Sequence, residues 1–172
     1  MKQLEEGLKK LKNMQITYEP VGIVHTPFKS KEGMPIQTRG GKGIKGQIIV
    51  KEELASGLTD LDGFSHIILI YHFHKSVGFD LQTIPFLDNN KRGVFSTRAP
   101  KRPNSIGISV VRLLSIDKNI LNIENVDILD GTPLLDIKPY IPDFDIHKIE
   151  KIGWVENKTD KLNEIKSDKR FE

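Results

Sequence analysis

The 172-residue sequence contains no cysteine. Disulfide bonds, thiolate metal sites and cysteine nucleophiles are therefore excluded. No apolar run has the length of a membrane-spanning helix, because residues 64–73 form only a short run that includes His66 and His72. The basic N-terminus lacks the apolar centre of a secretory signal. We therefore expect a cytoplasmic protein with no membrane partner, long enough for one domain with its own core.

Acidic residues are missing from one stretch, because no Asp or Glu lies between Lys91 and Ile116 although six Lys and Arg residues do. Solvated surfaces usually mix both signs. Pro100 and Pro103 restrict the backbone, so residues 99–104 should form a stiff loop. Guanidinium groups on a stiff loop suit a planar or anionic ligand. The alternative is a basic loop that serves only solubility, and the net charge of +3 permits an anionic partner without requiring one.

Hydrophobic periodicity divides the chain into three parts. Residues 1–14 have leucines at helical spacing and are predicted to form a helical appendage. Residues 15–155 alternate short β-rich runs with glycine and proline, which favours a mainly antiparallel barrel or sandwich. Residues 156–172 form a charged tail. The expected strands are 21–24, 47–50, 64–73, 93–97, 106–116 and 120–129, with a hairpin turn at 117–119, a short helical stretch at 52–57 and a short irregular helix within 80–90.

Two patterns imitate known sites. Residues 41–46 match G-x-G-x-x-G, but the dinucleotide-binding motif follows a strand and opens a helix, whereas here a strand follows, so a flexible loop is favoured. His66, His72 and His74 have even separations, which would place them on one face of a straight strand. Three imidazoles could hold zinc. Buried or hydrogen-bonded histidines are the commoner outcome, and we predict no metal.

Two further motifs lie near the end of the domain. The run from Asp130 to Pro133 has the residues of a tight turn. Alternation then places Asp136, Lys138 and Tyr140 on one side of a strand. A carboxylate, an ammonium and a phenol brought together could orient a substrate or shift one another's pKa. The alternative is an exposed strand face with a single ion pair.

Seven segments follow one another in a fixed order, namely VGIVHTPF (21–28), PIQ (35–37), GFSH (63–66), GVFSTR (93–98), RPNSIG (102–107), DGTP (130–133) and DIKPY (136–140). Together they resemble the TsaA-like family, whose characterised members are the TrmO tRNA methyltransferases. The resemblance extends over residues 21–144. Ser105 departs from it, because family members often have a second proline there, and many bacterial members carry an additional C-terminal domain.

The resemblance implies a small antiparallel β-barrel with short helices that acts as a homodimer and binds S-adenosylmethionine near the subunit interface. It also implies N6-methylation of N6-threonylcarbamoyladenosine, the modified base 3′ of the anticodon, with threonine tRNA as the expected partner. The residues that match the family's cofactor contacts are Pro35, Ile36, Gln37, His74, Lys75, Arg98, Ile108, Leu129, Asp130, Gly131 and Thr132.

Roles for other residues follow from chemistry. Lys101, Arg102 and Asn104 on the stiff loop are predicted to bind the tRNA. The N6 proton needs an acceptor, for which Asp136 and Tyr140 are both able, with Lys138 tuning either; the sequence does not choose between them. Two other functions stay open. One is a non-catalytic RNA-binding barrel, which a single aromatic, Phe95, in the basic stretch disfavours. The other is a zinc-dependent hydrolase built on the three histidines.

Overall fold

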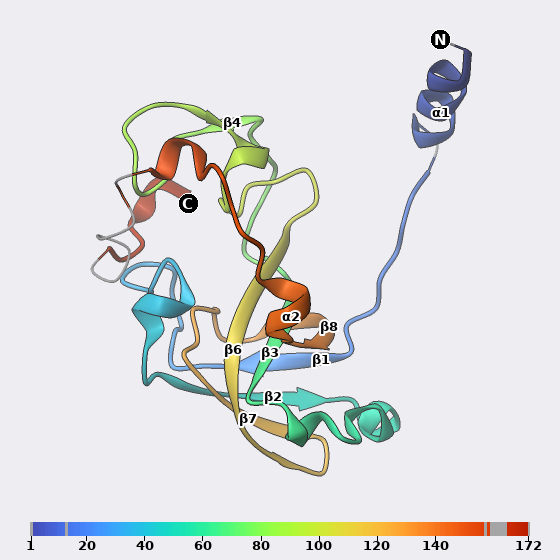
Figure 1. The fold of residues 1–172 in the computed structure, drawn as a ribbon, viewed down its shortest axis with the longest axis vertical. Helices are drawn as coiled ribbons and strands as arrows, with labels where there is room; N and C mark the ends of the chain where they lie inside the picture. The colour runs from blue at the N-terminus through green and yellow to red at the C-terminus, as the bar shows by residue number, and fades with distance from the viewer. Residues whose placement is uncertain (1, 13, 157, 159–164, 172) are drawn as a thin grey trace.

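A computed structural model describes residues 2–12, 14–156, 158 and 165–171. Six antiparallel strands close into a barrel in the order β1-β2-β7-β6-β3-β8 (Figure 1). Closure through β1 and β8 leaves neither strand as a free edge. The predicted antiparallel barrel is thereby confirmed. Its strands are β1 (Gly22–His25), β2 (Lys45–Val50), β3 (His66–His72), β6 (Ile106–Asp117), β7 (Ile120–Glu124) and β8 (Thr132–Pro139).

Alternating side chains fill the barrel. On β3, Ile67, Leu69 and Tyr71 point inward and are buried, whereas the residues between them are only partly covered. The 117–119 turn joins β6 to β7, and Lys118 there adopts a φ of 56°. The core cluster contains Val24, Ile48, Val50, Leu58, Ile67, Leu69, Tyr71, Val111, Leu113, Leu121, Ile123, Val126, Ile128 and Leu134.

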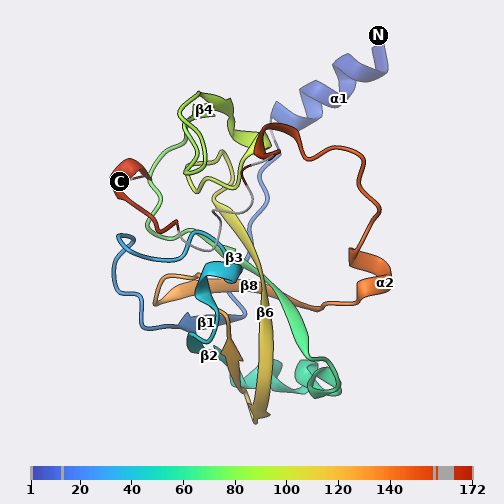
Figure 2. The same ribbon diagram turned by 60° about the vertical axis from the view of Figure 1, so that its left-hand side comes forward.

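Irregular segments surround the barrel. In Figures 1 and 2 the N-terminal helix α1 (Lys2–Lys12) stands away from it, and the segment containing β4 (Gln82–Thr83) lies beside the C-terminus. Helix α2 (Pro142–Asp145) is short and exposed. No helix of the described part of the chain is long and apolar enough to cross a membrane. The 3₁₀ helices are Thr38–Gly41, Glu52–Leu58, Leu61–Gly63, Val94–Ser96, Gly153–Val155 and Lys169–Phe171.

Three local predictions were wrong. Residues 93–97 are not a strand, since β5 (Arg92–Gly93) pairs only with β4 and is followed by a 3₁₀ turn. The irregular helix expected within 80–90 is replaced by β4 and turns, because Pro85 interrupts the helical pattern. The strand expected over 120–129 ends at Glu124, where Asn125 adopts a positive φ of 67° and the chain turns across the end of the barrel.

Candidate functional site

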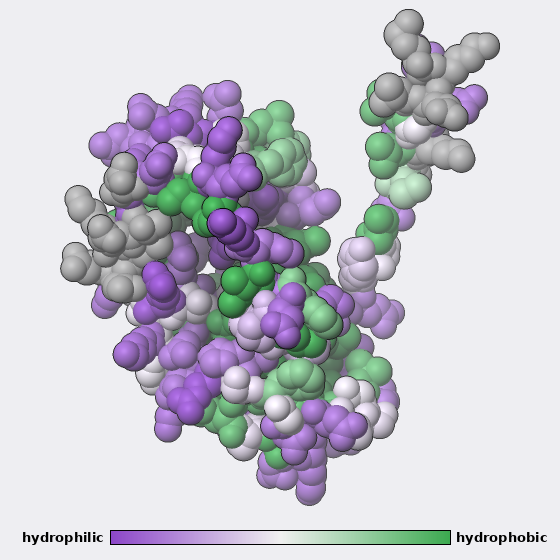
Figure 3. Space-filling view, viewed as in Figure 1, coloured by the Kyte–Doolittle hydropathy of each residue, from purple (hydrophilic) through white to green (hydrophobic). Residues whose placement is uncertain are grey.

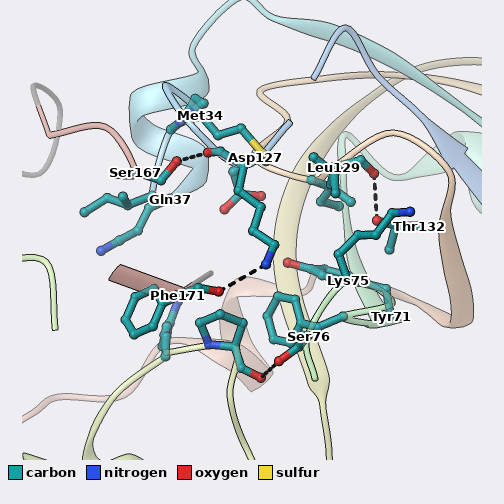
Figure 4. Close-up of a pocket in the computed structure, with 18 of the residues that line it drawn as sticks. Met34, Gln37, Tyr71, Lys75, Ser76, Asp127, Leu129, Thr132, Ser167 and Phe171 are labelled. Atoms are coloured by element: carbon teal, nitrogen blue, oxygen red, sulfur yellow. Dashed lines mark hydrogen bonds between the residues drawn. The ribbon is translucent and has the colours of Figure 1, made fainter. Parts of the chain in front are cut away.

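A cavity of about 300 Å³ lies at one end of the barrel (Figure 4). It is bounded by the end of β3, the start of β6 and the connection from β7 to β8. Residues within 31–37, 97–102 and 167–171, together with Phe86, supply its remaining wall. Its volume falls at the lower end of the range for small-molecule sites.

A hydrogen-bonded chain of three side chains runs along the barrel side of the cavity. The Tyr71 hydroxyl lies 3.0 Å from Ser109 Oγ, and Ser109 Oγ donates to Asp127 Oδ1 at 2.7 Å. Since the single proton of Ser109 goes to Asp127, Tyr71 is the donor to Ser109. Gly107 is required beside them, because a Cβ there would lie 2.3 Å from the Tyr71 ring.

Burial governs the ionisation of this chain. Loss of solvent raises the pKa of Asp127 to about 6, although the bond from Ser109 and the charge of Arg98 oppose that rise. Burial and the nearby Asp127 charge raise the pKa of Tyr71 far above its ordinary value. Tyr71 therefore stays a neutral donor across the physiological range, whereas Asp127 is ionised above about pH 6.

Arg102 holds the loop side of the cavity in place. Arg102 donates through Nη1 to the carbonyl oxygens of Thr97 at 2.9 Å, Val94 at 3.1 Å and Ala99 at 3.4 Å. Its guanidinium carbon also lies 5.8 Å from the centre of the Phe95 ring. The stiff loop predicted for residues 99–104 therefore uses its own arginine as an internal brace.

The C-terminal segment forms a third side. Ser167 N–H donates to the Met34 carbonyl at 2.8 Å, and Gly33 N–H donates to the Ser167 carbonyl at 2.9 Å. Lys31 Nζ donates to the Phe171 carbonyl at 3.1 Å. Figure 4 marks a hydrogen bond at Phe171 with a dashed line. Phe171 is buried and meets Phe86 edge to face, with 5.1 Å between ring centres.

Two further arrangements orient polar groups at the cavity. Thr132 Oγ1 donates to the Leu129 carbonyl at 2.7 Å and lies 3.3 Å from His74 Nδ1. Burial and the neighbouring Lys75 lower the pKa of His74, so its imidazole is neutral at physiological pH. Since the Thr132 proton is already used, a protonated Nδ1 of His74 is the donor to Thr132.

Two arginines of the stretch without acidic residues, 91–116, pair with carboxylates from outside it. Asp88 pairs with Arg92 at 2.7 Å, and the bond from Arg92 depresses the pKa of Asp88. Glu124 pairs with Arg112 at 3.3 Å. Arg98, in contrast, lines the cavity and makes no hydrogen bond or ion pair with another described residue. Its charge is therefore available to a ligand.

Nine of the eleven residues expected to contact a cofactor line this cavity. The structure places Asp130 and Gly131 outside that lining. Asp130 instead accepts from Lys29 at 2.6 Å and from the Thr26 amide at 3.0 Å, and these bonds lower its pKa to about 2. The nine are Pro35, Ile36, Gln37, His74, Lys75, Arg98, Ile108, Leu129 and Thr132.

The residues expected to take part in catalysis lie on the outside of the barrel. Asp136 and Lys138 form a half-exposed ion pair at 2.8 Å, and the Tyr140 ring meets His66 at a centre-to-centre distance of 6.4 Å. None of the three lines the cavity of the described chain. The strand register nevertheless places Asp136 opposite Ile70, which is itself opposite the cavity residue Ile108.

Of the residues expected to bind RNA, Arg102 lines the cavity and braces the loop, while Asn104 is exposed. His66, His72 and His74 do not form a metal site, because the described residues contain no group of three or more His, Asp or Glu side chains placed to hold a metal. Several lining residues were not predicted from the sequence. They are Lys31, Met34, Tyr71, Phe73, Ser76, Phe86, Asp127, Ser167, Asp168 and Phe171, among others.

Comparison with known proteins identifies the family. Residues 23–146 match the model of the tRNA-methyltransferase O N-terminal domain. The chain is 52% identical to a probable S-adenosyl-L-methionine-binding protein of Pyrococcus abyssi, over 92% of this chain and 86% of that protein. It is 37% identical to the Escherichia coli tRNA (adenine(37)-N6)-methyltransferase, over 73% of this chain and 57% of that protein.

A solved structure agrees with this relationship. The crystal structure of TrmO from Pseudomonas aeruginosa matches with a TM-score of 0.69 and 33% identity. The match covers 82% of this chain and 63% of the TrmO chain, so the bacterial protein has a substantial part outside the match. The family model and the shared fold lead to one conclusion: this chain belongs to the family of the tRNA-methyltransferase O N-terminal domain.

Proposed function

We propose that this protein is a cytoplasmic, S-adenosylmethionine-dependent tRNA methyltransferase. It methylates N6 of N6-threonylcarbamoyladenosine at position 37, the position named for the Escherichia coli relative. The observation that carries the proposal is the gathering of nine expected cofactor contacts, from five separate segments, around one cavity. The names of the archaeal relatives as S-adenosyl-L-methionine-binding proteins support the cofactor.

The cavity suits the proposed cofactor chemically. Ile36, Met34 and Leu129 supply apolar surface for a purine and an aliphatic chain. Arg98 supplies a fixed positive charge for a carboxylate. When bound, the sulfonium supplies an activated methyl group that a nitrogen can accept in an in-line displacement. The barrel's contribution is then mainly positioning, which can account for much of a rate enhancement.

We further propose a homodimer that packs through the outer face of β3, β6 and β8. The register places Ile68 opposite Val110 and Ile70 opposite Ile108 on this face, where a solvated barrel would have polar residues. Ile108 is 53% exposed although it also lines the cavity. Apolar surface between the barrel and the loops above it is visible in Figure 3. A second copy on this face would cover the mouth of the cavity.

The same dimer would give Asp136, Lys138 and Tyr140 a role. They border the apolar face rather than the cavity of their own chain, so they are placed to approach a base held at the cavity of the other chain. Asp136 and Tyr140 remain the candidate acceptors of the N6 proton, with Lys138 paired to Asp136 at 2.8 Å.

The proposed tRNA partner is threonine tRNA, bound through Lys101, Arg102 and Asn104. Arg102 already donates to three carbonyl oxygens through Nη1, so its contribution to RNA binding comes through the rest of its guanidinium group and through the loop shape it maintains. Phosphate contacts from such a loop would add sequence-independent affinity that falls with salt.

The test is methyl transfer from S-adenosylmethionine to tRNA with and without the threonylcarbamoyl group, with binding measured calorimetrically. We expect saturable cofactor binding and transfer only to modified tRNA, with light scattering at the mass of a dimer. Binding of tRNA without any affinity for the cofactor would instead favour a non-catalytic RNA-binding barrel. Transfer to unmodified adenosine would refute the proposed substrate, and a fully active monomer would refute the dimer.

A further inference from the structure

The cavity contains many cationic groups and few anionic ones. Lys31, Lys75, Arg98 and Arg102 all line it. S-adenosylmethionine itself carries two positive centres, the sulfonium and the α-ammonium group, beside one carboxylate. A site crowded with cations would repel those centres unless a carboxylate stands beside them.

Two of the described lining residues, Asp127 and Asp168, have a carboxylate. Only Asp127 has no arginine or lysine of the described chain bonded to its carboxylate. Asp168 is occupied by Arg170, which donates to it through Nε and Nη2 at 2.8 to 3.0 Å. Asp127 accepts one side-chain hydrogen bond, from Ser109 to Oδ1 at 2.7 Å. Its Oδ2 receives no hydrogen bond from another described residue.

The position of Asp127 is fixed by the buried residues on either side of it in the chain. It lies between the buried residues Val126 and Ile128 in the connection that crosses the end of the barrel. Figure 4 shows it between Met34 and Ser167 on one side and Leu129 and Thr132 on the other. A partly buried carboxylate that is held through Oδ1, and whose Oδ2 accepts no hydrogen bond from another described residue, is suited to act as the counter-ion of a bound cation.

We propose that Asp127 is the cofactor-binding counter-ion, whose Oδ2 contacts a positive centre of S-adenosylmethionine. Ser109 and Tyr71 are positioning residues that orient this carboxylate through their hydrogen bonds. The inference rests on the proposed use of S-adenosylmethionine. It adds a residue outside the eleven expected contacts and gives it a specific chemical partner.

The experiment compares three adenosine ligands by calorimetry in the wild type and in Asp127→Asn. S-adenosylmethionine has both positive centres, S-adenosylhomocysteine keeps only the ammonium, and 5′-methylthioadenosine has neither. We expect the variant to bind S-adenosylmethionine about 10- to 150-fold more weakly, the range for a lost hydrogen bond to a charged group. Binding of methylthioadenosine should change less than about twofold. A matching loss for S-adenosylhomocysteine would identify the ammonium as the partner, and a much smaller loss would identify the sulfonium.

Two controls keep the outcome decisive. Glu124→Gln removes a carboxylate that pairs with Arg112 and does not line the cavity, so all three affinities should be unchanged. Ser109→Ala keeps the Asp127 charge and loses its orientation, so it should lower the affinity for S-adenosylmethionine relative to methylthioadenosine by less than Asp127→Asn does. An equal change for all three ligands in Asp127→Asn, or none, would overturn the inference alone. A wild type that binds none of them would overturn the proposed function with it.

Discussion

The two sides of the cavity are built in different ways. On the barrel side, Tyr71 and Ser109 belong to paired strands, and their positions follow from the strand register. On the other side, residues 31–37, 94–102 and 167–171 are held by scattered hydrogen bonds, such as those of Arg102 and Lys31 to carbonyl oxygens. The first side can open only if the barrel unfolds, whereas the second can detach while the barrel persists. Substitutions in the barrel should therefore lower mainly the free energy of unfolding. Substitutions on the other side should lower mainly the affinity for the cofactor.

The largest effect is expected from a change inside the barrel. Leu134 on β8 is fully buried, and Leu134→Ala leaves a void among residues that cannot collapse to fill it. We expect a loss of about 2–5 kcal/mol in the free energy of unfolding, measured by urea titration. Cofactor affinity measured at a temperature where the variant is folded should stay within about threefold of the wild type. A stability change below about 1 kcal/mol would contradict a tightly packed barrel.

A smaller change in the free energy of unfolding, in the direction of higher stability, is expected from a substitution of Asp127. Its pKa is raised to about 6 in the folded protein, so the folded state binds the proton more tightly than the unfolded chain does. Stability is therefore greatest below the unfolded pKa and falls as the pH rises through about 6. Asp127→Asn removes this loss, and we expect it to unfold with a free energy on the order of 2 kcal/mol higher than the wild type above pH 7.

The measurement is the difference in unfolding free energy between Asp127→Asn and the wild type from pH 4 to pH 8. It should be near zero at pH 4 and rise toward pH 7. Arg98, Ser109 and Tyr71 face this carboxylate, and Tyr71 does not titrate in this range. A variant that is more stable yet binds the cofactor more weakly would show that the charge is kept for function. A difference independent of pH would mean that the Asp127 carboxyl has an ordinary pKa.

A third effect separates the two sides directly. Phe171 packs against Phe86 in the C-terminal segment, so Phe171→Ala should release that segment from the cavity. Because the segment can detach locally, we expect less than about 1 kcal/mol of change in global unfolding. Hydrogen exchange at Gly33 and Ser167, whose amides bond across this contact, should accelerate and cofactor affinity should fall. Unchanged exchange at both amides would show that Phe171 does not hold the segment in place.

The contrast between the two sides also explains what the sequence could predict. Alternation located most barrel strands, and motif order located nine cavity residues that come from five segments. The contacts of residues 167–171 carry no periodicity, so no pattern connected that segment to the site. Two missed residues did leave a signal. Ser109 is a polar residue at an inward position of β6, and Asp127 is a charged residue between two buried apolar ones.

The smallest effect is expected on the outer surface of the loop side. Lys101→Ala should remove one proposed phosphate contact and leave in place the bonds through which Arg102 braces the loop, which go to the carbonyl oxygens of Val94, Thr97 and Ala99. We expect the slope of log K for tRNA binding against log salt to fall in magnitude by about 0.7–0.9. Cofactor affinity should be unchanged. Arg102→Ala should behave differently, because it removes the brace as well as a charge, and it should weaken cofactor and tRNA together. If the two variants give the same pattern, Lys101 and Arg102 share one role, and the separation between a bracing arginine and an RNA-binding lysine is wrong.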